Sequence, residues 1–196
     1  MSITLIIGPM FSGKTSELIR LVDRKRIADK KCLIIKHLKD TRYDTPNTIT
    51  CITTHMELKY SACDIIHVNN FGTNIDLETS IQNRYEVVAI EEGHFYSGLN
   101  DFCIKLANHG IDVIVSALDS NFKQDLFLEI GKLIANAETV IKLDAICMVC
   151  KNCDASFTIR TTNSTELIVV GGTETYKSVC RNCLNSFKNS KTQNQN

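Results

Sequence analysis

The segment from Gly8 to Thr15, GPMFSGKT, matches the phosphate-binding loop pattern GxxxxGK[ST] at every fixed position. The apolar run 3–7 precedes it and predicts a buried strand, and a stretch with apolar residues at helical spacing follows it. Strand, glycine loop and helix form the context that this pattern requires. The alternative is an ordinary strand–helix turn that contains glycine. The sequence therefore predicts a phosphate site directly after the first strand.

The residue types in this loop suit a nucleoside triphosphate. Glycines let the backbone wrap closely around a phosphate, and the N-terminus of the following helix adds partial positive charge. Lys14 can reach the β- and γ-phosphates, and the hydroxyl of Thr15 can hold Mg²⁺. We expect the whole loop to bind ATP: Gly8, Pro9, Met10, Phe11, Ser12, Gly13, Lys14 and Thr15.

Apolar runs alternate with helical patterns along the first three-quarters of the chain. Strands are predicted at 3–7, 32–35, 65–68, 87–90, 111–115 and 140–143, and helices at 14–28, 76–83, 99–108 and 126–135. Continuous apolar strands between helices are typical of parallel sheets that are buried on both faces. The predicted fold is therefore α/β, a mostly parallel sheet of the P-loop NTPase type with helices on both faces.

Charge and composition narrow the functional class. Lys plus Arg and Asp plus Glu number 22 each, which argues against a protein whose main task is to hold nucleic acid. The N-terminus carries no signal-peptide pattern and no apolar run approaches the length of a membrane span, so we expect a soluble, cytoplasmic protein without a membrane partner. Nine cysteines in such a chain favour reduced thiols or metal ligands over disulfides.

Two acidic residues follow the predicted strand 87–90. An apolar strand that ends in an acid is the usual second motif of phosphate-loop proteins, and its carboxylate helps to hold Mg²⁺. We expect Glu91 to serve the metal and Glu92 to accept a proton from a hydroxyl nucleophile. The alternatives are that the pair only solvates the end of the strand, or that His94 is the base, although a single histidine is more often packed.

A polar loop, 39–43 (KDTRY), follows the second predicted strand. Its arginine, Arg42, could stabilise charge on the phosphates during transfer. A solvated loop is an equally simple interpretation of this segment.

Two CxxC pairs, Cys147 with Cys150 and Cys180 with Cys183, have the spacing of zinc knuckles. Four thiolates would make a closed, structural Zn²⁺ site, and residues 151–179 would loop out between the pairs. Cys153 complicates the assignment because it forms another CxxC with Cys150. A redox CxxC is the alternative, but such motifs occur singly at the start of a helix.

These patterns predict three parts of the chain. Residues 1–143 would form the ATP-binding α/β domain, residues 144–184 a small zinc-bound domain, and residues 185–196 a disordered polar tail.

Seven motifs then occur in a fixed order: GPMFSGKT, KDTRY, EEGHFY, ALDSNF, CMVC, LIVVGGTETY and CRNC. In this order they closely resemble the type II thymidine kinase family over nearly the whole chain. The resemblance implies transfer of the γ-phosphoryl of ATP to the 5′-hydroxyl of thymidine, giving dTMP for DNA synthesis. It further implies a homotetramer, feedback inhibition by thymidine triphosphate, and a lasso between the cysteine pairs that closes over the nucleoside.

The resemblance assigns roles to individual positions. Glu92 corresponds to the general base, and Lys14 and Arg42 to the groups that act on the phosphates. The nucleoside contacts correspond to Met10, Asp40, Phe95, Leu118, Phe122, Thr158, Leu167, Ile168, Val169, Val170, Gly171 and Tyr176. The resemblance also selects Cys147, Cys150, Cys180 and Cys183 as zinc ligands.

In the lasso, Gly171 and Gly172 can adopt positive φ and admit a ligand closely, so we expect Gly171→Val to be far more damaging than Val169→Ala. Three positions depart from the family pattern: Glu91 stands for a usual Asp, His94 for a usual Gln, and Cys153 is a possible substitute ligand. The competing functions are another deoxynucleoside kinase and, from a different class, a zinc-containing ATPase module stimulated by nucleic acid. A GTP switch would need an NKxD-type guanine motif, which the sequence lacks.

Overall fold

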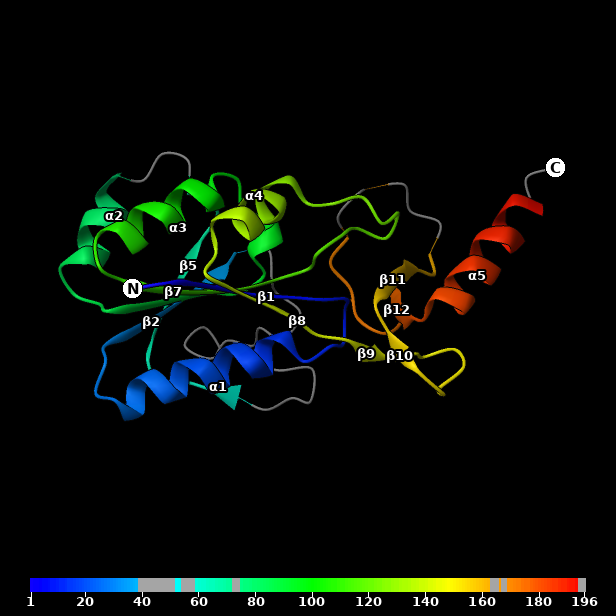
Figure 1. Cartoon of the computed structure of the whole chain (residues 1–196), viewed down its shortest axis with the longest axis horizontal. Coiled ribbons are helices and arrows are strands. Elements are labelled where there is room, and N and C mark those ends of the chain that lie inside the picture. The colour runs from blue at the N-terminus through cyan, green and yellow to red at the C-terminus, as the bar shows by residue number, and fades with distance from the viewer. Residues whose placement is uncertain (39–51, 54–58, 72–74, 163–165, 167–168, 194–196) are drawn as a thin grey trace.

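The computed structural model describes residues 1–38, 52–53, 59–71, 75–162, 166 and 169–193. A six-stranded sheet with helices on both sides forms the larger part, and a cysteine-containing lobe with a long terminal helix lies at one end of it (Figure 1).

The strands of the sheet lie in the order β5 (Asp64–Val68), β2 (Cys32–His37), β6 (Val87–Ile90), β7 (Asp112–Ala117), β1 (Ile3–Ile7) and β8 (Thr139–Lys142). All neighbouring pairs are parallel. The predicted parallel α/β sheet is thus confirmed, with each predicted strand present. Strand β2 extends two residues beyond its predicted end because the polar side chains of Lys36 and His37 are also buried.

Helices cover the two faces of the sheet unequally. Helix α1 (Lys14–Ile27) packs Leu18 and Val22 against one face. The opposite face carries α2 (Ile75–Gln82), α3 (Leu99–Asn108) and α4 (Leu128–Asn136), as Figure 1 shows. Because both faces are covered, the central strands are apolar throughout, which is why their sequence showed continuous runs rather than alternation.

The topology determines where a ligand can bind. Strands β6, β7 and β1 are neighbours in the sheet, so the loops that follow them meet at one edge. Ligands of open parallel sheets bind at this carboxyl edge. The phosphate loop follows β1, the two glutamates follow β6, and the residues from Leu118 onward follow β7.

The lobe has a core of its own. It contains the antiparallel pairs β9 (Ala145–Ile146) with β10 (Asp154–Ala155) and β11 (Phe157–Arg160) with β12 (Tyr176–Val179), followed by α5 (Arg181–Gln193). A further short pair, β3 (Ile52–Thr53) with β4 (Lys59–Tyr60), and a 3₁₀ turn, η1 (Gly93–Phe95), belong to the larger part. The limits of the predicted domains at 143 and 184 stay a prediction.

The predicted disordered tail from residue 185 is wrong for most of its length. Helix α5 continues to Gln193, and residues 194–196 lie outside the described part. Leu184 is buried in the core of the lobe and Phe187 packs against it. Three residues apart on a helix, these side chains share one face, which explains why the helix continues through a polar sequence. No helix in the described part of the chain is both long and apolar enough to cross a membrane.

Candidate active site

The phosphate loop links β1 to α1 with a strained backbone. Gly8 has a φ of 152° and Gly13 a φ of 81°. A Cβ on Gly8 would lie 2.3 Å from the carbonyl oxygen of Leu143, so that position admits only glycine. The Lys14 ammonium lies over the loop and donates to the carbonyl of Pro9 at 2.6 Å. The loop thus has the backbone that a phosphate cradle needs and a cation already folded over it.

The two glutamates after β6 point to different places. Glu91 is buried, and its Oε1 accepts a hydrogen bond from the Thr15 hydroxyl at 3.0 Å. Glu92 has a left-handed backbone, with φ 52° and ψ 47°, and lines the neighbouring pocket. This conformation costs a non-glycine residue about 1–2 kcal/mol, and such strain concentrates at functional sites. The turn places one carboxylate beside the phosphate loop and the other in the pocket.

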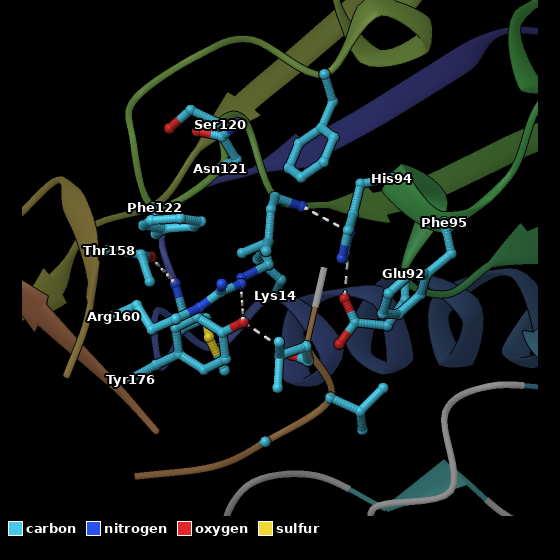
Figure 2. A pocket seen from close by; sticks show the side chains of 16 residues that line it. Lys14, Glu92, His94, Phe95, Ser120, Asn121, Phe122, Thr158, Arg160 and Tyr176 are labelled. Carbon is cyan, nitrogen blue, oxygen red and sulfur yellow. Dashed lines mark hydrogen bonds and ion pairs between the residues drawn. The ribbon is translucent and has the colours of Figure 1, made fainter. Parts of the chain in front are cut away.

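His94 lies next to Glu92. Its Nδ1 is 3.5 Å from Oε2 of Glu92 and accepts the N–H of Leu118 at 3.3 Å (Figure 2). A neutral imidazole that accepts at Nδ1 carries its proton on Nε2. The His94 ring also packs against Phe95 and Phe127, with centroids 4.3 Å and 5.1 Å away. The histidine therefore packs as the simpler alternative expected, while still touching Glu92.

A hollow of about 610 Å³, including its open mouth, lies between the carboxyl edge of the sheet and the lobe. Its wall gathers eleven of the predicted site residues: Met10, Lys14, Glu92, Phe95, Leu118, Phe122, Thr158, Val169, Val170, Gly171 and Tyr176. Aromatic and aliphatic side chains thus surround one carboxylate and one lysine (Figure 2).

Hydrogen bonds at this pocket hold the lobe together and join it to the larger part. The N–H of Met10, in the phosphate loop, donates to Oγ1 of Thr158 in β11 at 2.9 Å. The Tyr176 hydroxyl donates to the carbonyl of Val169 at 2.8 Å. Phe11 packs against the core of the lobe. The phosphate loop and the cysteine lobe are therefore in direct contact.

Four predicted site residues, Asp40, Arg42, Leu167 and Ile168, lie outside the described part of the chain. Their roles stay predictions. The described residues Val169 and Val170, which close the predicted strand-like run of the lasso, have no regular secondary structure. Neither Gly171 nor Gly172 uses the positive φ that glycine permits. What requires glycine at Gly171 is proximity, since an added Cβ would lie 2.7 Å from Cβ of Thr175.

Sequence reasoning did not select Ser120, Asn121, Phe127 or Arg160, which also line the pocket. For Arg160 a signal existed. It lies two residues after Thr158, and alternate residues of a strand share a face. Had β11 been recognised, its period would have placed Arg160 beside Thr158 in the pocket.

The four cysteines of the two knuckles converge on one point. The sulfurs of Cys147, Cys150, Cys180 and Cys183 all lie within 4.8 Å of one another. Four sulfurs around Zn²⁺ at about 2.3 Å would be about 3.8 Å apart, so the cluster is compatible with structural zinc after a small contraction. Cys153 lies outside this group, although its sulfur is 3.6 Å from that of Cys150.

Without a cation these thiols do not share one protonation state. Burial raises the pKa of Cys147, but backbone N–H groups of Cys150, Cys180 and Val149 outweigh it and lower that pKa to about 6. The backbone N–H of Cys183 is the main cause of a lowered pKa at Cys180. The hydrogen bond with Cys180 raises the pKa of Cys183 to about 12. A divalent cation would allow all four to ionise, because it offsets the repulsion between neighbouring thiolates.

Comparisons with known proteins agree on one family. The model of the family described as thymidine kinase matches residues 1–184. A thymidine kinase of Acanthamoeba polyphaga mimivirus is 56% identical over 193 residues, which cover 98% of this chain and 85% of the relative. Thymidine kinase 1 of Dictyostelium discoideum is 42% identical over 95% of this chain and 79% of its own length. A thymidine kinase of Myxoma virus (strain Lausanne) is 45% identical, with coverage of 92% and 94%.

Proposed function

The chain belongs to the thymidine kinase family and acts as a thymidine kinase, and from this premise we propose how its pocket performs the reaction. ATP donates its γ-phosphoryl group, the phosphate loop binds the triphosphate, and thymidine occupies the pocket with its 5′-hydroxyl toward Glu92. The breaking bond joins the γ-phosphorus to the bridging oxygen of ADP, and the new bond joins that phosphorus to the 5′-oxygen.

One observation carries this proposal. Glu92 and Lys14 line the same pocket, and aromatic side chains from two different loops complete its wall. A general base must lie within hydrogen-bond reach of the proton that it removes, and a phosphate-binding lysine must reach the transferred group. The pocket offers both next to a surface that suits a planar base.

Glu92 takes the proton of the 5′-hydroxyl as the oxygen attacks. The strained backbone at Glu92 directs its carboxylate into the pocket rather than along the strand. His94 packs beside the same carboxylate while its Nδ1 accepts the N–H of Leu118, so the ring borders the pocket on the side where the base lies. Lys14, now bonded to Pro9, would exchange that carbonyl for phosphate oxygens when ATP binds.

Thr15 and Glu91 would hold Mg²⁺. The hydroxyl and the carboxylate are oxygen ligands of the kind that Mg²⁺ prefers, and they already lie 3.0 Å apart. Bound there, the ion would neutralise charge on the β- and γ-phosphates. The longer side chain of Glu91, in place of the usual Asp, can still reach Thr15.

The four-cysteine cluster would hold one structural Zn²⁺. It ties β9 and β10 to the start of α5, and the lobe built on it supplies Thr158, Val169 and Tyr176 to the pocket. We further propose, from the family resemblance, a cytoplasmic homotetramer that thymidine triphosphate inhibits.

The test is a panel of nucleosides incubated with ATP and the purified protein, with and without Mg²⁺ and with and without DNA. We expect a monophosphate from thymidine, only with Mg²⁺, and no effect of DNA. Glu92→Gln should keep ATP binding and lower turnover by about 10²–10⁴-fold, because an amide cannot take the proton. The matched control is Glu86→Gln, at the opposite end of the same strand, where the carboxylate binds Lys30 in solvent.

Three results would overturn the proposal. Turnover of Glu92→Gln within a few-fold of the parent would remove Glu92 as the base and make His94 the candidate. Preferred phosphorylation of another deoxynucleoside would change the substrate, and phosphate release that depends on DNA would favour an ATPase module.

A further inference from the structure

Arg160 is a buried cation in the wall of the pocket, and no role has been assigned to it above. It ends strand β11, and its side chain is 1% exposed, among the largest fully buried side chains of the protein. A buried guanidinium stays charged, and its desolvation is offset only where hydrogen bonds and aromatic faces surround it. Its surroundings therefore indicate what it holds in place.

Phe122, Tyr176 and Glu166 contact the guanidinium. Its central carbon lies 4.0 Å from the centroid of the Phe122 ring, so the group stacks on that ring. Nη2 donates to the Tyr176 hydroxyl at 2.9 Å, and Nη1 donates to the carbonyl of Glu166. Figure 2 shows Arg160 between the Phe122 and Tyr176 rings.

These contacts reach three separate segments. Phe122 follows β7 in the larger part, Tyr176 begins β12, and Glu166 belongs to the stretch between β11 and β12. The Tyr176 hydroxyl, which accepts from Arg160, in turn donates to the carbonyl of Val169 at 2.8 Å and so links Arg160 to Val169. The Arg160 side chain thus links the Phe122 ring to the backbone carbonyl of Glu166 directly and to that of Val169 through Tyr176.

The side chain of Gln124 joins the loop that carries Phe122 to strand β11. Nε2 of Gln124 donates to the carbonyl of Phe122 at 2.8 Å and, more weakly, to that of Thr158 at 3.4 Å. The backbone of this loop is therefore attached to β11, and the stacked guanidinium sets the plane of the ring.

We propose that Arg160 is a positioning residue for the nucleoside: it orients the Phe122 ring and, through Tyr176, holds Val169 at the wall of the pocket. This inference rests on the proposed binding of thymidine there. Arginine is needed because a planar, forked group can stack on one ring and donate in two directions at once. A lysine at this position would keep the charge and lose both the stacking plane and one direction of donation.

The test compares Arg160→Met and Arg160→Lys with Arg181→Met. Arg181 is a matched control, since it also stacks on a phenylalanine of the lobe, Phe157 at 4.5 Å, but is exposed and does not line the pocket. KM for thymidine and for ATP, kcat, melting temperature and zinc content are measured for each protein.

For Arg160→Met we expect KM for thymidine to rise roughly 10- to 100-fold, while KM for ATP stays within about two-fold and zinc content is unchanged. Arg160→Lys should recover only a small part of the loss. Arg181→Met should match the parent. A merely structural role would instead lower the melting temperature and the active fraction without changing KM for thymidine.

A mutant cycle tests the connection through Tyr176. Tyr176→Phe should raise KM for thymidine, and the double variant with Arg160→Lys should be little worse than the more severe single variant, because both remove the same bond. If the double variant raises KM for thymidine by the product of the two single effects, Arg160 does not act through Tyr176. If Arg160→Met does not fold, this cycle decides alone.

Phe122→Ala separates failure of this inference from failure of the proposed pocket. If Phe122→Ala raises KM for thymidine and Arg160→Met does not, Arg160 has no positioning role. If neither variant changes that KM, thymidine binds elsewhere.

Discussion

A methyl group added at Gly171 tests whether the lasso backbone must approach Thr175 closely. The new Cβ of Gly171→Ala would lie 2.5 Å from Oγ1 and 2.7 Å from Cβ of Thr175. Rotation of the Thr175 side chain can move Oγ1 but not Cβ. The backbone of Thr175 is also held on both sides, since its N–H donates to Gly172 at 3.1 Å and its carbonyl accepts from Thr161 at 2.9 Å.

The strain must therefore move the segment that carries Gly171, which lines the pocket. Forcing an extra carbon into a filled site costs about 1–3 kcal/mol. If that cost falls on the arrangement that binds the nucleoside, kcat/KM for thymidine drops by about 5- to 150-fold, at 1.4 kcal/mol for each factor of ten. Gly171→Val should be worse, because its branched side chain adds two more carbons.

Gly172→Ala is the matched control. Its Cβ would meet only Oε2 of Glu174 at 2.9 Å, the far end of an exposed side chain whose carboxylate can turn while Oε1 keeps the hydrogen bond from the Gly172 N–H. We expect a change of less than about three-fold. The assay is kcat/KM for thymidine at saturating ATP, with zinc content checked in each variant. Equal effects at Gly171 and Gly172 would refute the reasoning and leave the pair as an ordinary turn.

Three further predictions concern other parts of the site. Val169→Ala should reduce thymidine binding by about 1–3 kcal/mol at most, because its carbonyl still accepts from Tyr176; a larger loss of kcat/KM would mean that the side chain recognises the base. Thr15→Val should raise the Mg²⁺ concentration that gives half-maximal activity, because the hydroxyl beside Glu91 is lost; an unchanged Mg²⁺ titration would contradict this role. Cys180→Ser should lower both zinc content and melting temperature, and Cys153→Ser neither; metal analysis with no zinc in the freshly purified, reduced parent would remove the zinc assignment.

The sheet was predictable because its strands are buried on both faces. The runs at 3–7 and 87–90 gave β1 and β6 with their observed limits, since every side chain there except Thr4 is buried. Helix α3 was equally clear from its apolar spacing. The end of a strand was harder to predict where the strand continues into buried polar residues. Strand β2 continues to His37, which binds the carbonyl of Asn69 and packs on Tyr96.

The lobe was harder to predict because its strands are too short for periodicity. Strands β9 and β10 have two residues each, and converging cysteines at their ends supply order that no apolar pattern records. Arg160 was missed for a different reason. A charged residue in a short strand usually indicates a solvent-exposed face. The two-residue spacing from Thr158 points to the pocket only once β11 is known, and the packing of Phe122 and Tyr176 around Arg160 then shows why it is buried.

The division of the pocket between sheet and lobe determines when the pocket can exist during synthesis of the chain. Strand β8 completes the sheet at Lys142, so the phosphate loop, Lys14 and both glutamates can take their places while the last quarter of the protein is still on the ribosome. Thr158 and Tyr176 arrive later, and Cys183 later still. A nascent chain therefore completes the proposed triphosphate site before the lobe that walls the pocket, and the fourth cysteine of the cluster is synthesised last.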